Sequence, residues 1–81
     1  MKCEITLFAL LKDRVGKSHL SLEVVEPVTG RALLDALCED YPALLPLADT
    51  ILISVNQDFA NPEQVIGAGD EVVLFTPVSG G

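Results

Sequence analysis

The sequence predicts a single α+β domain in which one mixed sheet packs against one main helix. Three observations predict this class: two alternating strand patterns near the N-terminus, one amphipathic helix, and further strand patterns towards the C-terminus. Strands separated by a helical crossing are typical of a sheet with its helix on one face. At 81 residues the chain has the length of one domain, which we place at 1–75, followed by a flexible tail at 76–81.

Two alternating apolar patterns at the N-terminal end predict a hairpin. The first strand is expected over residues 2–9 and the second over 19–25. One face of the first strand carries Cys3, Ile5, Leu7 and Ala9. Phe8 is the apolar exception on the opposite face. The charged stretch 11–17 contains Gly16 and is expected to form a turn or a single helical turn.

One amphipathic helix is expected in the middle of the chain. Thr29 is a typical N-cap residue, and Pro42 ends the helical pattern. The apolar positions that recur at helical spacing are Leu33, Leu34, Leu37, Cys38 and Tyr41. The apolar segment 43–49, interrupted by Pro46, predicts one or two further helical turns.

Two more strands are predicted after the helix, at 51–55 and 71–75. The first is almost continuously apolar, which predicts burial on both of its faces. A turn at 56–58 and a brief strand at Phe59-Ala60 follow it. Gly67-Ala68-Gly69-Asp70 predicts the turn that leads into the last strand.

An apolar patch is expected on the sheet face that carries no helix. Alternation along the last strand turns Val73 and Phe75 away from the helix, and Phe8 lies beside them if the first and last strands pair. A contiguous apolar patch usually marks a contact surface. The alternative is that loops or the 43–49 segment cover the patch.

The last residues predict a slender arm that carries a free carboxylate. Pro77 ends the strand pattern because proline has no backbone donor. Val78 and Ser79 follow it, and the chain ends with Gly80 and Gly81, which have no Cβ. Such an arm fits a narrow active site in which side chains would collide. The alternatives are a frayed terminus and a cloning scar.

Charge and cysteine content argue against several classes of function. A net charge of −7 disfavours nucleic acid, which needs a Lys/Arg surface. The apolar run Ile5–Leu11 is too short to span a bilayer and precedes no cleavage site, so a cytoplasmic protein is expected. Cys3 and Cys38 are expected to be reduced core residues, and His19 a surface residue. The sequence contains no metal-ligand spacing and no catalytic set.

Several short motifs together resemble one family. They are Leu7-Phe8-Ala9, Ser54-Val55-Asn56-Gln57, Gly69-Asp70-Glu71-Val72 and Phe75-Thr76-Pro77-Val78-Ser79-Gly80-Gly81. In this order and at these spacings they resemble the small subunit of molybdopterin synthase, the MoaD family of sulfur carriers. The resemblance covers essentially the whole chain and implies a β-grasp, ubiquitin-like fold.

The resemblance also implies a chemistry for the tail. A ubiquitin-activating-like adenylyltransferase would adenylate Gly81 with ATP and magnesium, and this chain itself would bind no cofactor. A sulfur donor such as a cysteine desulfurase or rhodanese would then form a thiocarboxylate. The carrier would insert its tail into the large subunit, in a heterotetramer of two small and two large subunits. There it would donate sulfur to precursor Z (cyclic pyranopterin monophosphate) and build the dithiolene of molybdopterin.

The family's functional positions carry over residue by residue. Insertion of the tail would involve Pro77, Val78, Ser79 and Gly80, with Gly81 as the carrier. The residues expected at partner contacts are Phe8, Phe59, Val73, Phe75 and Lys12. This sequence departs from the family at Lys12, where an Arg is common, and at Thr76, where a proline is frequent. Lys12 keeps the charge but lacks the bidentate fork of arginine.

Two alternative functions are open, a related carrier and a module of a different class. The first is another ubiquitin-like carrier or modifier, of the thiamin pathway or of transfer RNA thiolation. Thiamin carriers tend to be shorter and to lack the Phe-x-Pro-Val ending, and a conjugating modifier would form isopeptide adducts with lysines. The second is a non-catalytic interaction module. We expect no standalone catalytic activity from this chain.

Overall fold

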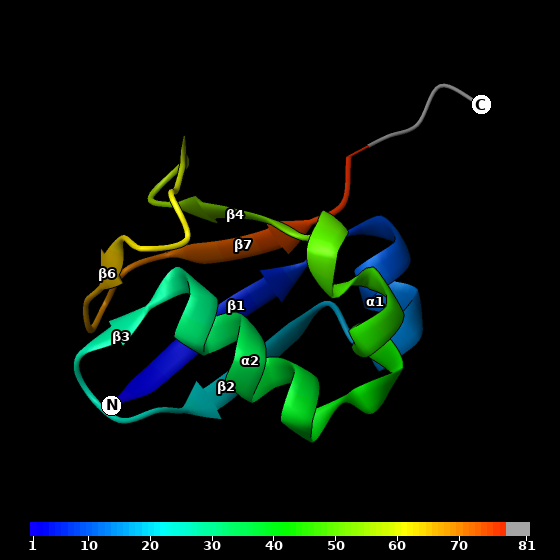
Figure 1. The fold of residues 1–81 in the computed structure, drawn as a ribbon, viewed down its shortest axis with the longest axis horizontal. Coiled ribbons are helices and arrows are strands. Elements are labelled where there is room, and N and C mark those ends of the chain that lie inside the picture. Colours follow the sequence, from blue (N-terminus) through cyan, green and yellow to red (C-terminus); the bar gives the residue numbers. More distant parts are fainter. Residues whose placement is uncertain (78–81) are drawn as a thin grey trace.

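The computed structural model describes residues 1–77, and its main feature is a mixed sheet with strand order β2-β1-β7-β4-β5 (Figure 1). The five strands are β1 (Lys2–Leu7), β2 (His19–Glu23), β4 (Leu52–Val55), β5 (Asp58–Phe59) and β7 (Val72–Phe75). The central pair, β1 and β7, is parallel, and the other pairs are antiparallel. The first and last strands therefore pair, as the predicted patch requires.

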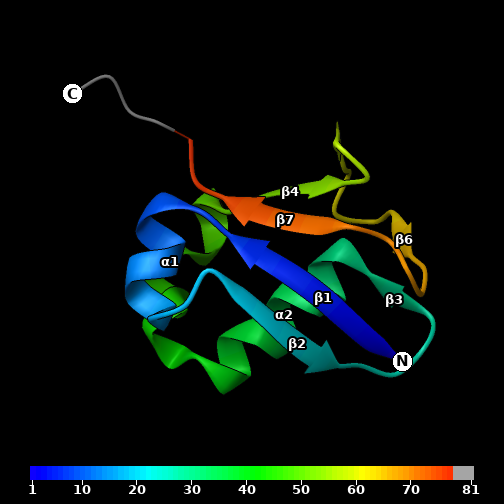
Figure 2. The same cartoon turned by 180° about the vertical axis from the view of Figure 1, so that it is seen from behind.

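Helix α2 (Gly30–Asp40) crosses one face of this sheet, and the opposite face carries no helix within residues 1–77 (Figures 1 and 2). Alternating side chains from the strands meet apolar side chains of the helices between the two layers. The side chains of this core that are fully buried are Ile5, Leu7, Leu11, Leu33, Leu37, Leu44, Val72 and Leu74. We call the uncovered side the open face.

Helix α1 (Ala9–Val15) interrupts the predicted first strand and is longer than the turn expected there. The strand ends at Leu7, so the prediction that Ala9 continues it was wrong. Leu11 drives this change because it turns inward and is completely buried. Gly16 ends α1 in a left-handed conformation (φ 92°), with its N–H donating to the Lys12 carbonyl at 2.8 Å.

Helix α2 begins and ends as predicted. Thr29 is its N-cap, because the Ala32 N–H donates to Thr29 Oγ1 at 3.2 Å. Gly30 lies against the sheet, and a Cβ at this position would come within 2.8 Å of Ile53 Cδ1. A 3-10 helix, η1 (Pro42–Thr50), follows α2 and buries Leu44.

The expectation that strand 51–55 is buried on both faces was wrong. Ile53 and Val55 face the core, but Leu52 is 38% exposed and Ser54 is half-buried. The physical reason is that the open face has no second layer to cover these positions. The strand alternates like a half-covered antiparallel strand.

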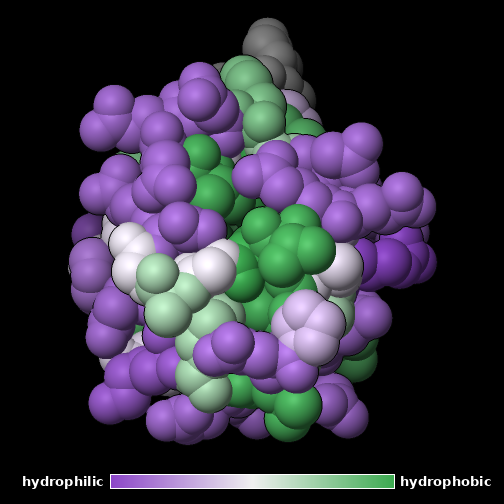
Figure 3. Space-filling model, turned by 90° about the vertical axis from the view of Figure 1, so that its left-hand side faces the viewer, coloured by the Kyte–Doolittle hydropathy of each residue, from purple (hydrophilic) through white to green (hydrophobic). Residues whose placement is uncertain are grey.

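A second, two-stranded sheet was not predicted. It pairs β3 (Val28–Thr29) with β6 (Val65–Ile66), and it lies at the end of the molecule that carries the N-terminus (Figure 1). Two residues are too few for alternation to show in the sequence. Figure 3 looks onto this end, where a few hydrophobic side chains are surrounded by hydrophilic ones.

Candidate functional site

Strand pairing brings side chains of four strands into rows on the open face. Val73 lies opposite Thr6 on one side and Ser54 on the other, and Ser54 lies opposite Phe59. In the next row, Phe75 lies opposite Leu52. Residues far apart in the sequence therefore form one surface because β7 occupies the middle of the sheet.

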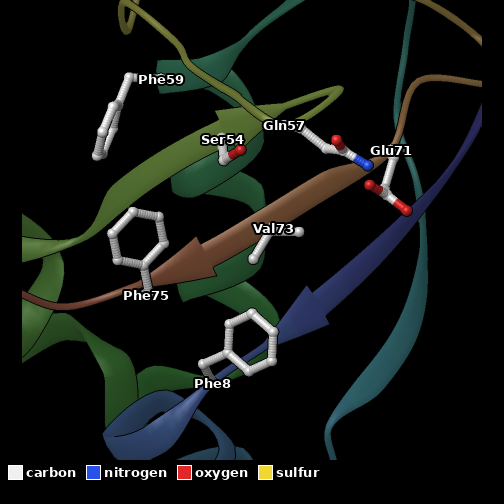
Figure 4. Close-up of a pocket in the computed structure, with 7 residues that line it drawn as sticks. All are labelled: Phe8, Ser54, Gln57, Phe59, Glu71, Val73 and Phe75. Atoms are coloured by element: carbon white, nitrogen blue, oxygen red, sulfur yellow. The ribbon is translucent and has the colours of Figure 1, made fainter.

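This surface contains an open hollow of ≈ 410 Å³. Its lining residues are Phe8, Ser54, Gln57, Phe59, Glu71, Val73 and Phe75 (Figure 4). The three aromatic rings lie towards the end at which β7 finishes, whereas Gln57 and Glu71 lie at the opposite end (Figure 4). We call it the aromatic hollow.

The aromatic side chains come from three separate elements. Phe59 and Phe75 pack together with ring centroids 5.8 Å apart and planes tilted by 53°. Phe8 is the N-cap residue of α1, and its N–H donates to the Leu74 carbonyl at 3.2 Å. Phe8 and Phe59 are nevertheless 53% and 77% exposed. A gathered group of exposed aromatic rings is typical of a surface that binds another protein.

A pair of turns holds the polar end of the hollow in place. Asn56 and Gln57 both have positive φ, 53° and 74°, as in the tight turns that join hairpin strands. Asn56 Nδ2 donates to Asp70 Oδ1 at 3.1 Å, and the Glu71 N–H donates to Asn56 Oδ1 at 3.0 Å. The two central motifs of the sequence thus meet in space, and their contact places Gln57 beside Glu71 (Figure 4).

Asp70 is held as a charged carboxylate in this arrangement. Its Oδ2 accepts the Gly67 N–H at 2.8 Å, while Oδ1 accepts from Asn56. The Gly67 hydrogen bond, followed by that of Asn56, lowers the pKa of Asp70.

The predicted partner-contact residues are placed as follows. Phe8, Phe59, Val73 and Phe75 share the aromatic hollow. Lys12 is exposed on α1 but does not line it. Pro77 is exposed after β7. The predicted tail positions Val78, Ser79, Gly80 and Gly81 lie outside the residues that the structure describes.

Three residues of the hollow were not among the predicted site residues. Ser54 was missed because its strand was interpreted as buried on both sides, although a polar residue between Ile53 and Val55 signals an exposed face. Glu71 was expected to point away from the helix, and it does, but no role was assigned to it. Gln57 reaches the hollow only through the turn, which alternation along a strand does not reveal.

The remaining candidate groups lie apart from the aromatic hollow. Cys3 and Cys38 are buried free thiols, as expected, and burial raises the pKa of both. His19 is exposed, with Nδ1 3.3 Å from Thr6 Oγ1. Residues 1–77 contain no group of three or more His, Cys, Asp or Glu side chains arranged to hold a metal. Nor does any helix in that range have the length and apolarity to cross a membrane.

Comparison with known protein families shows to which family the chain belongs. The model of the ThiS family matches residues 5–81. The chain belongs to the ThiS family. This ThiS-family chain is 31% identical to the molybdopterin synthase sulfur carrier subunit of Dictyostelium discoideum, over 96% of the chain and 94% of that protein. It is also 36% identical to small archaeal modifier protein 1 of Haloferax volcanii, over 96% and 99%.

Solved structures of related proteins share the fold. The crystal structure of SAMP1 from Haloferax volcanii superposes with a TM-score of 0.89 at 34% identity, and the match covers 100% of both chains. A complex of subunits 1 and 2 of molybdopterin-converting factor from Helicobacter pylori matches with a TM-score of 0.69 at 21% identity, again over 100% of both chains. The predicted ubiquitin-like β-grasp fold of this ThiS-family chain is confirmed, and so is its resemblance to the MoaD family.

Proposed function

We propose that this ThiS-family protein is the sulfur carrier subunit of a molybdopterin synthase. The observation that carries the proposal is the aromatic hollow, whose aromatic rings lie towards the end of β7 after which the sequence continues to Gly80 and Gly81. A docking surface beside a reactive terminus lets one contact both hold the partner and aim the tail. The names of several relatives favour the same function.

The chemistry is carried by the carboxyl group of Gly81. A carboxylate is a poor electrophile, so an activating enzyme first joins it to AMP from ATP and magnesium and releases pyrophosphate. The terminal sulfur of a persulfide on a donor such as a cysteine desulfurase or rhodanese then displaces AMP and forms an acyl disulfide. A thiol reduces this S–S bond, which leaves the thiocarboxylate on Gly81 and a disulfide between the donor and the thiol. Each step replaces one difficult substitution with an easier one. The chain contributes the C-terminal tail and a docking face. Its partners contribute the ATP site and the acid–base groups.

The partner that takes up the sulfur is the large synthase subunit, two copies of which assemble with two carriers. The solved Helicobacter pylori complex of subunits 1 and 2 contains a chain with this fold, which supports such a pairing. The large subunit covers Phe8, Phe59 and Phe75, and it admits Pro77 through Gly81 to its active site. There the sulfur passes to precursor Z and Gly81 returns to a carboxylate. We place these steps in the cytoplasm, as expected from the sequence.

Intact-mass measurement tests the carrier chemistry. Incubation with the activating enzyme, ATP and a sulfide source should give a mass gain equal to the exchange of one oxygen for sulfur, localised to Gly81. Deletion of Gly81 should abolish the gain and leave the thermal unfolding midpoint unchanged. An unchanged mass of the wild type, with an enzyme that is active on another carrier, would contradict the proposal. Formation of molybdopterin from precursor Z after addition of the large subunit then tests the pathway.

A second candidate function is protein modification, favoured by the 36% identity to small archaeal modifier protein 1. In that case Gly81 would form an isopeptide bond with lysine side chains of other proteins. Mass spectrometry of digests made with a protease that cleaves after glutamate, from cells that express the protein, would detect lysines carrying the remnant 72–81 that follows Glu71. Such adducts, without molybdopterin formation, would favour this candidate over the synthase subunit.

A further inference from the structure

A second hollow of ≈ 250 Å³ lies on the same open face, towards the start of β1 and β7. Lys2, Glu4, His19 and Asp70 line it, together with Glu71. Glu71 also lines the aromatic hollow, so the two hollows are neighbours on this face. We call their union the sheet groove. It follows the strands from an acidic end to an aromatic end.

The acidic end carries an excess of negative charge. Glu4, Asp70 and Glu71 contribute three carboxylates, against the single ammonium group of Lys2. Within residues 1–77, the one ion pair joins the N-terminal amino group to Glu23 at 3.6 Å. The three carboxylates of the groove therefore have no ion-pair partner in the described part of the chain.

Two of these carboxylates, those of Glu4 and Asp70, are held in position by hydrogen bonds before any partner binds. Glu4 Oε2 accepts a hydrogen bond from Ser21 Oγ at 2.8 Å. Asp70 accepts from the Gly67 N–H and from Asn56. Ordered charges lose little conformational entropy on binding, so their attraction for an opposite charge is used more fully.

We propose that the sheet groove is a two-part docking surface for the large subunit. The large subunit places an apolar side chain against the aromatic end and one or more Lys or Arg side chains against Glu4, Asp70 and Glu71. This inference rests on the proposed function, since it specifies the chemistry of that same partner. Opposite charges speed association and fix orientation, while the desolvated apolar contact supplies most of the affinity.

The two ends together set the orientation of the partner on the sheet. β7 runs from the acidic end to the aromatic end, and Pro77 follows it. A partner that met only the apolar end could rotate about that contact. A partner held at both ends binds in one orientation, with its active site beyond Phe75.

Two double variants, each lacking two negative charges, distinguish a specific role of the acidic end from a general effect of net charge. The test variant is E4Q/E71Q, and the matched control is D35N/E39Q, which removes two exposed charges from α2 on the covered side of the sheet. Binding of the unmodified carrier to the large subunit is followed by stopped flow from low to high salt. We expect E4Q/E71Q to slow association about tenfold at low salt and to flatten its salt dependence. The control should stay within about twofold of the wild type under the same conditions.

The association rates of the two variants show whether the acidic end contacts the large subunit. Equal slowing of both variants would mean that net charge alone acts. No slowing of E4Q/E71Q would mean that the large subunit does not contact the acidic end. Either result would overturn the proposal of a two-part docking surface. In both cases the wild type still binds, so the proposed function survives. A wild type that acquires no sulfur and does not bind the large subunit would overturn the proposed function, and this inference with it. Thermal unfolding of each variant establishes that it is folded.

Discussion

Asn56 shows how one side chain can serve both the fold and the surface. Its positive φ of 53° is a conformation that asparagine tolerates better than most residues. Its amide donates to Asp70 and its carbonyl oxygen accepts the Glu71 N–H, so two turns are joined across the sheet. The amide thereby fixes a residue of the sheet groove without lining the aromatic hollow.

The carboxylate of Asp70 should make stability depend on pH. Its pKa is lower in the folded state, so in acid the unfolded chain binds more protons and stability falls as the pH drops through the lowered pKa. In D70N this part of the dependence should vanish, because the amide does not titrate. Urea unfolding of both proteins at pH values from 7 down to 3 measures it. Parallel pH profiles for the two would contradict the assignment.

Helix α1 is the element that differs most from the prediction made from the sequence. It places Leu11 in the core and ends the first strand at Leu7. As a result Phe8 is no strand residue but a helix N-cap. Its ring still reaches the open face because its backbone remains extended (φ −117°, ψ 154°).

Two neighbouring leucines of α1 provide a matched test of its packing. Leu11→Ala should lower the free energy of unfolding by about 2–5 kcal/mol, because it leaves a cavity at a completely buried site. Leu10→Ala makes the same chemical change at an exposed site and should cost no more than about 0.5 kcal/mol. Denaturant titration measures both. Equal costs would mean that α1 does not pack as described.

Long, periodic elements could be predicted from the sequence, and so could the brief strand β5 to within one residue, but the pair β3 and β6 could not. Three of the main strands and α2 follow from alternation and capping, and Val73 and Phe75 follow from the same alternation. β3 and β6 have two residues each and exist only because they pair with one another. Gln57 belongs to the hollow through a turn whose shape depends on the distant Asp70, which no local pattern shows.

On the scale of the whole molecule, the two faces of the sheet have different tasks. One is covered by α2 and supplies the stability of the core. The other leaves aromatic rings exposed, although burying them would be favourable by about 25 cal/mol per Å² of apolar surface. Residues kept exposed at that cost are explained by a partner that covers them.

Phe75→Ala tests whether the aromatic hollow is that contact. We expect affinity for the large subunit to fall by about 1–3 kcal/mol, as for a central aromatic residue of an interface. The control is Val25→Ala, at a site that is 88% exposed and does not line the hollow. Calorimetric titration at a temperature where both variants are folded measures the change. Unchanged affinity of the Phe75 variant would remove it from the interface.

The central position of β7 also decides when this surface comes into being. Its parallel pairing joins residue 5 to residue 72, and its other edge completes β4. During translation the hairpin of β1 and β2 and helix α2 can form early, but the sheet has no middle until residues 72–75 arrive. Closing so long a loop is slow, because its entropy cost is met before the contacts between the strands form. The open face is therefore complete only when β7 has joined β1 and β4.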